Sequence, residues 1–496
     1  MMMPFALSGG EEDFGMTDFV MPDDACWEPA QMSVDRGAFL GHIQRFLHAS
    51  VSKKVSRMYA APGADYCLRD CDYRVYTLRD KAPVLRNVFN QRLVTEQGMA
   101  FTVGRKLASF LSPKLFVCPN AAVGLLVLPI IPDLGDHPDI NLMVRFNYLL
   151  HKTDAKACRI TIDTSPDNRN YRKPAKSDGK CSDGSDHKLA EALGLDVPEG
   201  DRPSFTMSRL LGVMMRGVPY TRFNDDMLHV FTYIEIAPEV YKQDPDIPTH
   251  FTRLAMAISE RYDVTSSLVR RMMQLGAIED VFMGSTVSGG AIMTIVDGDS
   301  PQHHKEFVTK TLQQRYLWIY VMVLMQRHSL LNMTNWLINV DLDGDTEQTL
   351  RRVRRAVRRM SELTVNNRFS IISDYTQHNL FYQQCVDVLG IDALHTEVEQ
   401  KLDTLNDLVE QLSIERKEQV DASKEYWQAL LTVILTVLTM FSATNDGMEV
   451  LHKLGLPERC DTVATTIFLV VLLIAGIHFV GLKFYRLYSR RPRNKK

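Results

Sequence analysis

The sequence predicts an α/β (or α+β) domain followed by a long α-helical stalk and two transmembrane helices. Three observations lead to this fold class. Strand-like apolar runs alternate with helical patterns up to about residue 300. From there to residue 443 only helical patterns occur. Near the C-terminus, residues 426–443 and 463–482 form two apolar runs without any Asp, Glu, Lys or Arg.

Length and charge set the first limits on function. With 496 residues, the chain has room for two or three structural units. Its 57 Lys and Arg nearly balance its 60 Asp and Glu, so no basic excess indicates nucleic acid as a partner. The eight cysteines are scattered and are typical of reduced thiols rather than of a zinc site.

Residues 1–30 are acidic, contain no Lys or Arg and are interrupted by Gly and Pro, so we expect a mobile N-terminus. The opening residues lack the basic region and apolar run of a signal peptide. Residues 31–300 are expected to form the cytoplasmic α/β domain. Its predicted strands are 73–78, 114–118, 123–131, 141–150, 158–163, 227–236, 281–284 and 291–297. Its predicted helices are 36–60, 82–111, 205–217, 248–262 and 266–275, and 165–186 is expected to be a polar loop.

Residues 301–390 are predicted to be a helical cytoplasmic region. The apolar run 316–325 has only ten residues and lies inside a longer helical pattern, 306–340. Because a membrane span needs about 20 residues, we interpret this run as a buried core helix.

Residues 391–443 are predicted to form one stalk helix that continues into the first transmembrane helix. Ile391, Val398, Leu405 and Leu412 recur every seven residues, and neither Pro nor Gly interrupts residues 391–446. Such a repeat indicates packing against other helices. Two partners stay open: copies of the same helix, or the helical segment 350–388 of the same chain.

The two apolar runs predict a multi-pass protein of the cell inner membrane, with the lipid bilayer as a partner. The tail 483–496 carries seven Lys or Arg, which places both termini in the cytoplasm and leaves 444–462 as an external loop. The alternative is that both runs are buried core helices of a large domain.

Polar side chains of the stalk fall on one face of the predicted helix. Around a symmetry axis they would line a wet pore, whereas the alternative is that the threonines bond their own backbone or a neighbouring helix. The pore-lining residues expected from this pattern are Glu418, Asp421, Glu425, Gln428, Thr432, Thr436, Thr439 and Asp446.

This arrangement resembles the CorA family of magnesium channels. The stalk, the two apolar runs and the tail LKFYRLYSRRPRNKK carry the resemblance, which covers roughly residues 345–496. It implies a homopentamer that transports a divalent cation of the magnesium type. The family has Gly-Met-Asn after its first span, whereas here Glu449 follows Gly447 and Met448. Asn445 and Asp446 are local candidates for the missing amide.

The chain also resembles a divergent branch, the CorA-like membrane effectors of type III CRISPR systems. That resemblance implies an antiviral effector controlled by a nucleotide second messenger. A third interpretation is a membrane-anchored enzyme or scaffold. The sequence contains none of the motifs of a serine hydrolase, a zinc protease, a P-loop or a dinucleotide-binding fold, so we expect no enzyme.

Two further segments suggest ligand sites. Residues 350–360 place arginines on one helix, where Arg351, Arg354, Arg355 and Arg358 could hold a small anionic ligand or pair with acidic stalk residues. The run 339–347 resembles the start of a calcium loop but lacks its final Glu. The metal ligands suggested there are Asp341, Asp343 and Asp345.

Overall fold

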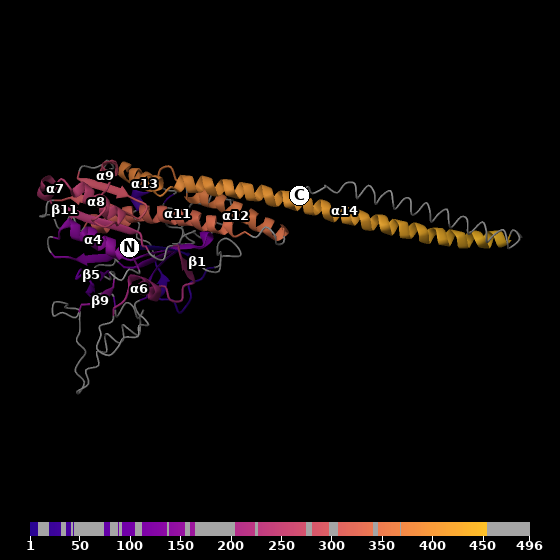
Figure 1. The fold of residues 1–496 in the computed structure, drawn as a ribbon, viewed down its shortest axis with the longest axis horizontal. Coiled ribbons are helices and arrows are strands. Elements are labelled where there is room, and N and C mark those ends of the chain that lie inside the picture. Colours follow the sequence, from indigo (N-terminus) through magenta and orange to yellow (C-terminus); the bar gives the residue numbers. More distant parts are fainter. Residues whose placement is uncertain are drawn as a thin grey trace, which may run out of the picture. The chain divides into compact units, whose positions relative to one another are not determined.

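The computed structural model describes residues 1–7, 19–30, 36–40, 43, 74–79, 88, 92–104, 112–135, 138–153, 159–163, 204–223, 227–273, 280–296, 306–340, 346–367 and 369–453. The chain divides into two compact units, Met1–Asp407 and Leu408–Lys496. Figure 1 shows the described elements in sequence colours.

A six-stranded antiparallel sheet is the centre of the first unit, with the strand order β10-β1-β7-β6-β3-β2. In chain order these strands are β1 (Met2–Leu7), β2 (Trp27–Pro29), β3 (Arg74–Leu78), β6 (Lys114–Cys118), β7 (Val123–Val127) and β10 (Tyr220–Arg222). Successive residues of a strand face opposite sides of the sheet. Met2 therefore belongs to one hydrophobic cluster and Met3 to another.

Close packing in this sheet depends on a glycine. Gly124 of β7 pairs with Phe5 of β1. A Cβ atom at Gly124 would lie 2.1 Å from the Phe5 ring, so the missing side chain makes room for the aromatic ring. The ring also meets Tyr220 of β10 edge to face. One glycine thus allows three neighbouring strands to share a packed aromatic pair.

Two smaller sheets complete the mixed architecture. The antiparallel order β8-β5-β4-β9 uses β4 (Leu93–Thr95), β5 (Ala100–Val103), β8 (Ile130–Asp133) and β9 (Ile160–Ile162). In the order β11-β13-β12, β11 (Val230–Ile236) is parallel and β12 (Val281–Ser285) antiparallel to β13 (Gly289–Ile295). The helices around these sheets are α4 (Ile140–His151), α6 (Met207–Met214), α7 (Pro238–Gln243), α8 (Ile247–Met256) and α9 (Ser266–Met273). Short 3₁₀ turns, η1 (Arg36–Ala38) and η2 (Pro119–Ala121), complete the set.

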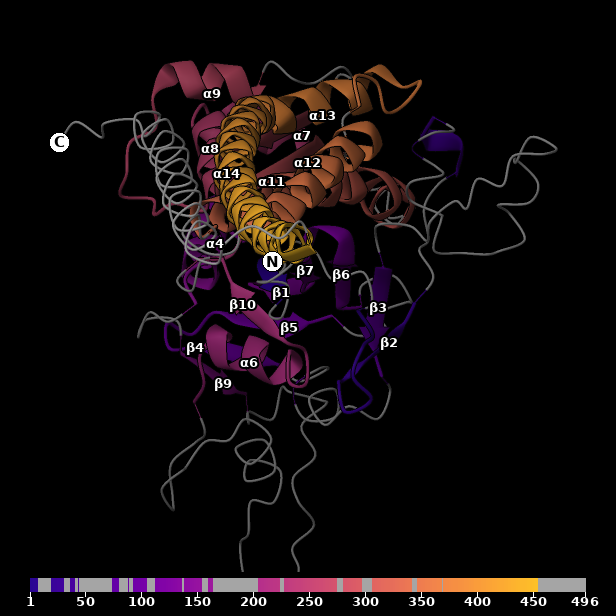
Figure 2. The same cartoon turned by 90° about the vertical axis from the view of Figure 1, so that its right-hand side faces the viewer.

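Helix α11 (Leu317–Ile338) runs through the largest hydrophobic cluster. It continues the π-helical segment η4 (Phe307–Tyr316) without a break. Every residue from 318 to 326 is buried, because the helix packs between β1 and β7 on one side and α12 (Thr346–Asn367) and α13 (Thr376–Val388) on the other. Figure 2 shows α11 above the central sheet. The prediction of a buried core helix within 306–340 is confirmed.

Three local predictions were wrong. Residues 141–150, expected to be a strand, belong to helix α4. Asp139 is the N-cap of this helix, and its side chain accepts a hydrogen bond from the Asn141 backbone amide at 3.1 Å. Residues 92–104, expected to be helical, contain β4 and β5. The N-terminus, expected to be mobile, contributes β1 and β2 to the central sheet, with Phe5 and Trp27 fully buried. The polar loop 165–186 lies outside the described residues.

Helix α14 (Ile391–Lys453) begins at the residue where the sequence predicted the stalk. It includes residues 444–453, which we had expected to form a loop. Its first turns pack within the first unit, where Ile391, Val398 and Leu402 are buried in the largest hydrophobic cluster. For the heptad repeat the sequence left two packing partners open, copies of the same helix or another segment of the same chain. For these first turns the partner is the same chain.

The prediction of transmembrane helices was wrong for the described part of the chain. Across those residues, no helix combines enough length with enough apolar character to cross a bilayer. Gln428 and three threonines interrupt the aliphatic residues of the first predicted span. The second, 463–482, and the tail 483–496 lie outside the described residues. The interpretation as a multi-pass channel protein of the inner membrane is therefore not supported.

Candidate functional site

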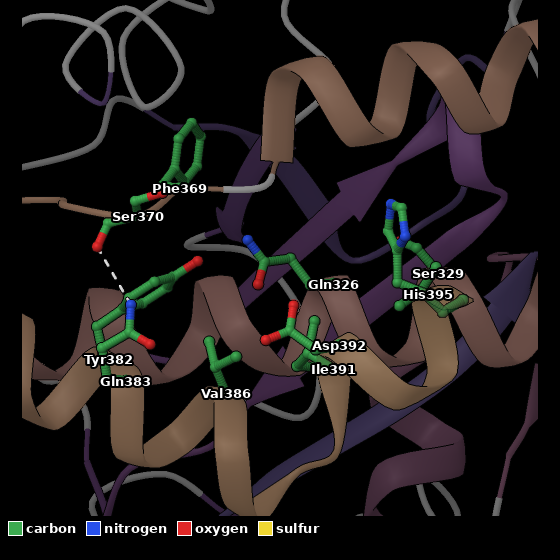
Figure 3. A pocket seen from close by; sticks show the side chains of 11 residues that line it. Gln326, Ser329, Phe369, Ser370, Tyr382, Gln383, Val386, Ile391, Asp392 and His395 are labelled. Carbon is green, nitrogen blue, oxygen red and sulfur yellow. Dashed lines mark hydrogen bonds between the residues drawn. The ribbon is translucent and has the colours of Figure 1, made fainter. Parts of the chain in front are cut away.

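A cavity of about 200 Å³ lies beside the beginning of α14. Its walls come from α11, from the turn before α13, from α13 itself and from the first turn and a half of α14. Figure 3 shows the side chains around it. The lining residues are Gln326, Ser329, Leu330, Phe369, Ser370, Tyr382, Gln383, Val386, Ile391, Asp392 and His395.

The inner wall of the cavity is polar and buried. Gln326, Ser329 and His395 each expose at most 5% of their surface. Tyr382 forms a hydrogen bond with the Gln326 side chain. Burial raises the pKa of the Tyr382 phenol, and the nearby Asp392 carboxylate raises it further. The phenol therefore keeps its proton at neutral pH and is a hydrogen-bond donor.

The outer rim of the cavity is open to water. Ser370, Gln383 and Asp392 are exposed there. Gln383 Nε2 donates a hydrogen bond to the Ser370 carbonyl oxygen at 3.1 Å, which closes the turn before α13 against that helix (Figure 3). A small molecule can therefore reach the cavity from solvent past these exposed side chains.

His395 connects the cavity to two helices. Its Nε2 lies 2.7 Å from the hydroxyl oxygen of Thr364 on α12, and its Nδ1 lies 3.3 Å from Oε2 of Glu399 one turn further along α14. Both contacts orient the imidazole ring at the edge of the cavity. The wall formed by α14 is consequently tied to α12 as well as to α11 and α13.

Among the described residues that line the cavity there is no Lys or Arg, and Asp392 is the one carboxylate. The predicted anion-binding residues Arg351, Arg354, Arg355 and Arg358 lie on α12 and are not among the lining residues. Arg351, Arg354 and Arg355 are exposed, as is Arg358. The structure thus separates the arginine face from the cavity.

The polar stripe predicted for the stalk lies on the second unit's part of α14. The hydroxyls of Thr432, Thr436 and Thr439 donate to the carbonyl oxygens of Gln428, Thr432 and Thr436, at 2.7, 2.7 and 2.9 Å. Those donors are therefore satisfied within the helix. Glu418, Asp421, Glu425 and Gln428 are exposed. Asn445, Asp446, Gly447 and Met448 belong to the same helix.

Asp341, Asp343 and Asp345, the suggested metal ligands, lie outside the described residues. Within the described residues, no group of three or more His, Cys, Asp or Glu side chains is arranged to hold a metal ion.

Sequence reasoning did not find the cavity. Its lining comes from four segments between residues 326 and 395, and those segments share no motif. The one available signal was the pair Gln326 and Ser329, polar residues in an otherwise apolar stretch of a core helix. Comparison with protein-family models, with curated proteins and with solved structures finds no match.

Proposed function

We propose that the protein is a self-associating regulatory protein in which a small polar ligand, the base of a nucleotide messenger, binds the cavity and acts on α14. One observation carries the proposal: Ile391, Asp392 and His395, from the beginning of α14, form a wall of a polar cavity. A ligand in that cavity directly contacts the N-terminal turns of the 63-residue helix.

The chemistry of the cavity favours a neutral, planar ligand. Amide, hydroxyl and carboxylate groups of Gln326, Gln383, Tyr382 and Asp392 offer both donors and acceptors, as the edge of a nucleobase requires. The Phe369 ring supplies an apolar surface beside them. The volume is below the roughly 300–1,000 Å³ of pockets for drug-sized molecules, so a single base fits better than a larger ligand.

The phosphate of such a nucleotide must stay outside the cavity. A phosphate next to Asp392 would be repelled by the carboxylate, because two negative charges at close range disfavour each other. Asp392 instead favours the exocyclic amino groups of a base, which are hydrogen-bond donors. Adenine, guanine and cytosine carry such groups and uracil does not, so we expect the first three to bind more tightly.

The junction between α13 and α14 is suited to transmit ligand binding. Leu389 and Gly390 separate the two helices, and Gly390 has a φ of +66°, a left-handed conformation that favours glycine. Because only two residues make the turn, a shift of the α14 wall changes the direction in which the helix leaves α13. Ligand binding therefore acts on α14 at its hinge.

The second unit's part of α14 presents apolar side chains that require a partner. Trp427, Leu431 and Leu435 expose 63%, 60% and 53% of their surface. Helices with such exposed apolar faces pack against other helices. We propose that copies of α14 pack together here, and the CorA resemblance implies five copies.

The test uses the full chain and a panel of nucleosides and nucleoside monophosphates. Isothermal titration is expected to show binding that Asp392→Asn weakens by about tenfold, through loss of a charge-assisted hydrogen bond. The matched control is Asp387→Asn on α13, an exposed carboxylate that does not line the cavity. Equal affinities of both variants and the wild type would refute the proposed ligand site.

Self-association is measured separately by sedimentation equilibrium with and without the best-binding nucleoside. We expect a homopentamer whose dissociation constant changes when the nucleoside is present. A monomer at all concentrations would refute the assembly, and an oligomer indifferent to a bound nucleoside would refute the coupling.

A further inference from the structure

A second polar cluster lies on α11 immediately after the residue that lines the cavity. Arg327 and His328 follow Gln326 in the sequence. The His328 ring packs against Phe223 with 4.8 Å between ring centroids and against His229 with 5.6 Å. The backbone of His229 is held by two hydrogen bonds with Met2 of the central sheet, at 2.8 and 2.9 Å.

Several polar atoms of this cluster have no hydrogen-bond partner among the described residues. Nε and Nη1 of Arg327 are buried without a hydrogen-bond partner, and so are both ring nitrogens of His328 and Nδ1 of His229. His328 exposes 6% of its surface. A buried guanidinium nitrogen without an acceptor is costly, as is a buried imidazole nitrogen without a partner. The cluster therefore calls for an acceptor that can meet several donors at once.

The charge of the cluster comes from the Arg327 guanidinium, because both imidazoles are neutral near pH 7. Burial, together with the smaller effects of Arg327 and His151, lowers the pKa of His229 to about 3. Burial also lowers the pKa of His328, with His229 and Arg327 adding to the effect. No Asp or Glu of the described residues contributes to the pKa shifts of Arg327, His229 or His328. The field thus favours a negative charge between these side chains.

We infer that Arg327, His328 and His229 form an oxyanion-binding site that takes a phosphate group. The planar fork of a guanidinium suits two oxygens of one phosphate. The two imidazoles can each supply a further donor. The side chain of Arg327 is partly exposed, which leaves a way in from solvent.

This site is distinct from the nucleobase cavity and stands on different residues. Ser329 and Gln326 line the cavity, whereas Arg327 and His328 do not. If phosphate does not bind at Arg327, the proposed nucleobase cavity is therefore unaffected. If no nucleoside binds the cavity, the proposed oxyanion site is likewise unaffected. Both sites nevertheless use residues of α11. An oxyanion bound by Arg327 and His328 contacts the same helix that forms a wall of the cavity.

The experiment titrates the full chain with inorganic phosphate by isothermal titration, with chloride at equal ionic strength as the reference. Wild-type protein is expected to bind phosphate saturably. Arg327→Gln is expected to weaken binding by about tenfold or more, because the fork is lost. Arg270→Gln on α9, an exposed arginine outside the cluster, is the matched control and is expected to leave the affinity unchanged.

A second measurement protects the test against a folding defect. In phosphate-free buffer, Arg327→Met is expected to raise the urea midpoint of the full chain, because it removes a half-buried cation, two nitrogens of which are buried without an acceptor. In phosphate the order is expected to reverse, since only the wild type gains stability from the ligand. A variant that is less stable in both buffers would overturn the inference.

Two outcomes point to another occupant. Asp225 and Asp226 follow Phe223 in the sequence and lie outside the described residues. If the wild type ignores phosphate and the double variant Asp225→Asn, Asp226→Asn binds it, the chain's own carboxylates fill the site and the inference fails. If Arg327→Gln and Arg270→Gln weaken binding equally, phosphate binds by general charge and the inference also fails.

Discussion

The hydroxyl oxygen of Thr364 lies 2.7 Å from Nε2 of His395, and this contact joins α12 to the beginning of α14 at the edge of the cavity. His395 is 5% exposed, so water cannot readily replace the threonine as its partner. The pair therefore holds one wall of the cavity in place, and removing the contact is expected to lower the free energy of unfolding.

Thr364→Val is expected to lower the free energy of unfolding by about 1–3 kcal/mol, because it leaves a buried imidazole nitrogen without a partner. Thr404→Val is the matched control: Thr404 is exposed on α14 and donates only to the Gln400 carbonyl oxygen, at 2.8 Å. Its effect is expected to stay within about 0.5 kcal/mol. Urea unfolding measures both, and equal losses would show that the contact with His395 contributes nothing.

Gly390→Ala is expected to destabilise the protein by about 1 kcal/mol, because a φ of +66° strains any residue with a Cβ atom. Nothing lies within 4 Å of the added Cβ, so the effect is purely a backbone effect. Gly212→Ala in α6 is the control with the opposite sign, expected to stabilise by about 0.5–1 kcal/mol as a helix-interior substitution. Thermal or urea unfolding of both variants checks the pair. Two changes of the same sign would contradict the assigned hinge.

Gly124→Ala is expected to cost about 1–3 kcal/mol through overpacking against the Phe5 ring. The backbone of β7 tolerates alanine, so the cost comes from the ring alone. Phe5→Leu removes the ring and should relieve the clash in the double variant. A double-mutant cycle in urea measures the coupling, and additive single effects would disprove direct contact between these two positions.

Acid is expected to destabilise the fold through the buried imidazoles. The folded state keeps His229 neutral with a pKa of about 3, whereas the unfolded chain takes up a proton near 6.5. This contribution to stability is complete above pH 6.5 and is lost as the pH falls toward 3. Between pH 7 and pH 5 the loss is about 2 kcal/mol.

The check compares urea unfolding of wild type and His229→Gln at several pH values in buffer without oxyanions. The variant is expected to show the shallower dependence on pH. Identical slopes would mean that His229 does not titrate between the folded and unfolded states. Added phosphate should also flatten the wild-type slope, because a bound anion raises the pKa of the imidazoles.

Leu431→Glu is expected to weaken self-association by about tenfold or more, because it puts a charge into the proposed helix interface. Ser423→Glu adds the same charge at an exposed polar position two turns earlier and is expected to have a smaller effect. Sedimentation equilibrium of the full chain measures both. If both variants associate as tightly as the wild type, residue 431 is not part of an interface.

Helix predictions succeeded where the pattern of neighbouring residues decides the structure. The apolar stretch within 306–340 is a buried helix, and the stalk begins at Ile391, because a continuous helical pattern needs no distant partner to be recognised. Strands with clear β-branched or aliphatic runs were found for the same reason: 114–118 is confirmed, and the predicted strand 227–236 contains β11, Val230–Ile236.

Residues 141–150 show the limit of that approach. An apolar run with few polar residues is compatible with a buried strand and with a buried helix, and neither length nor composition separates them. The cap at Asp139 and the burial of Val144, Phe146 and Leu150 against the neighbouring sheets decide for the helix.

By itself the sequence determined the mixed fold class, the helical region after residue 300 and the starting point of α14, because these follow from composition and periodicity along the chain. Only the tertiary structure decided the cavity, the Thr364–His395 contact and the cluster around Arg327. Each joins side chains from separate elements, and a one-dimensional pattern carries no information about which elements meet in space. The same applies to the side chains of α14: the heptad pattern showed that they need partners, and packing in the first unit decided which of them already have one.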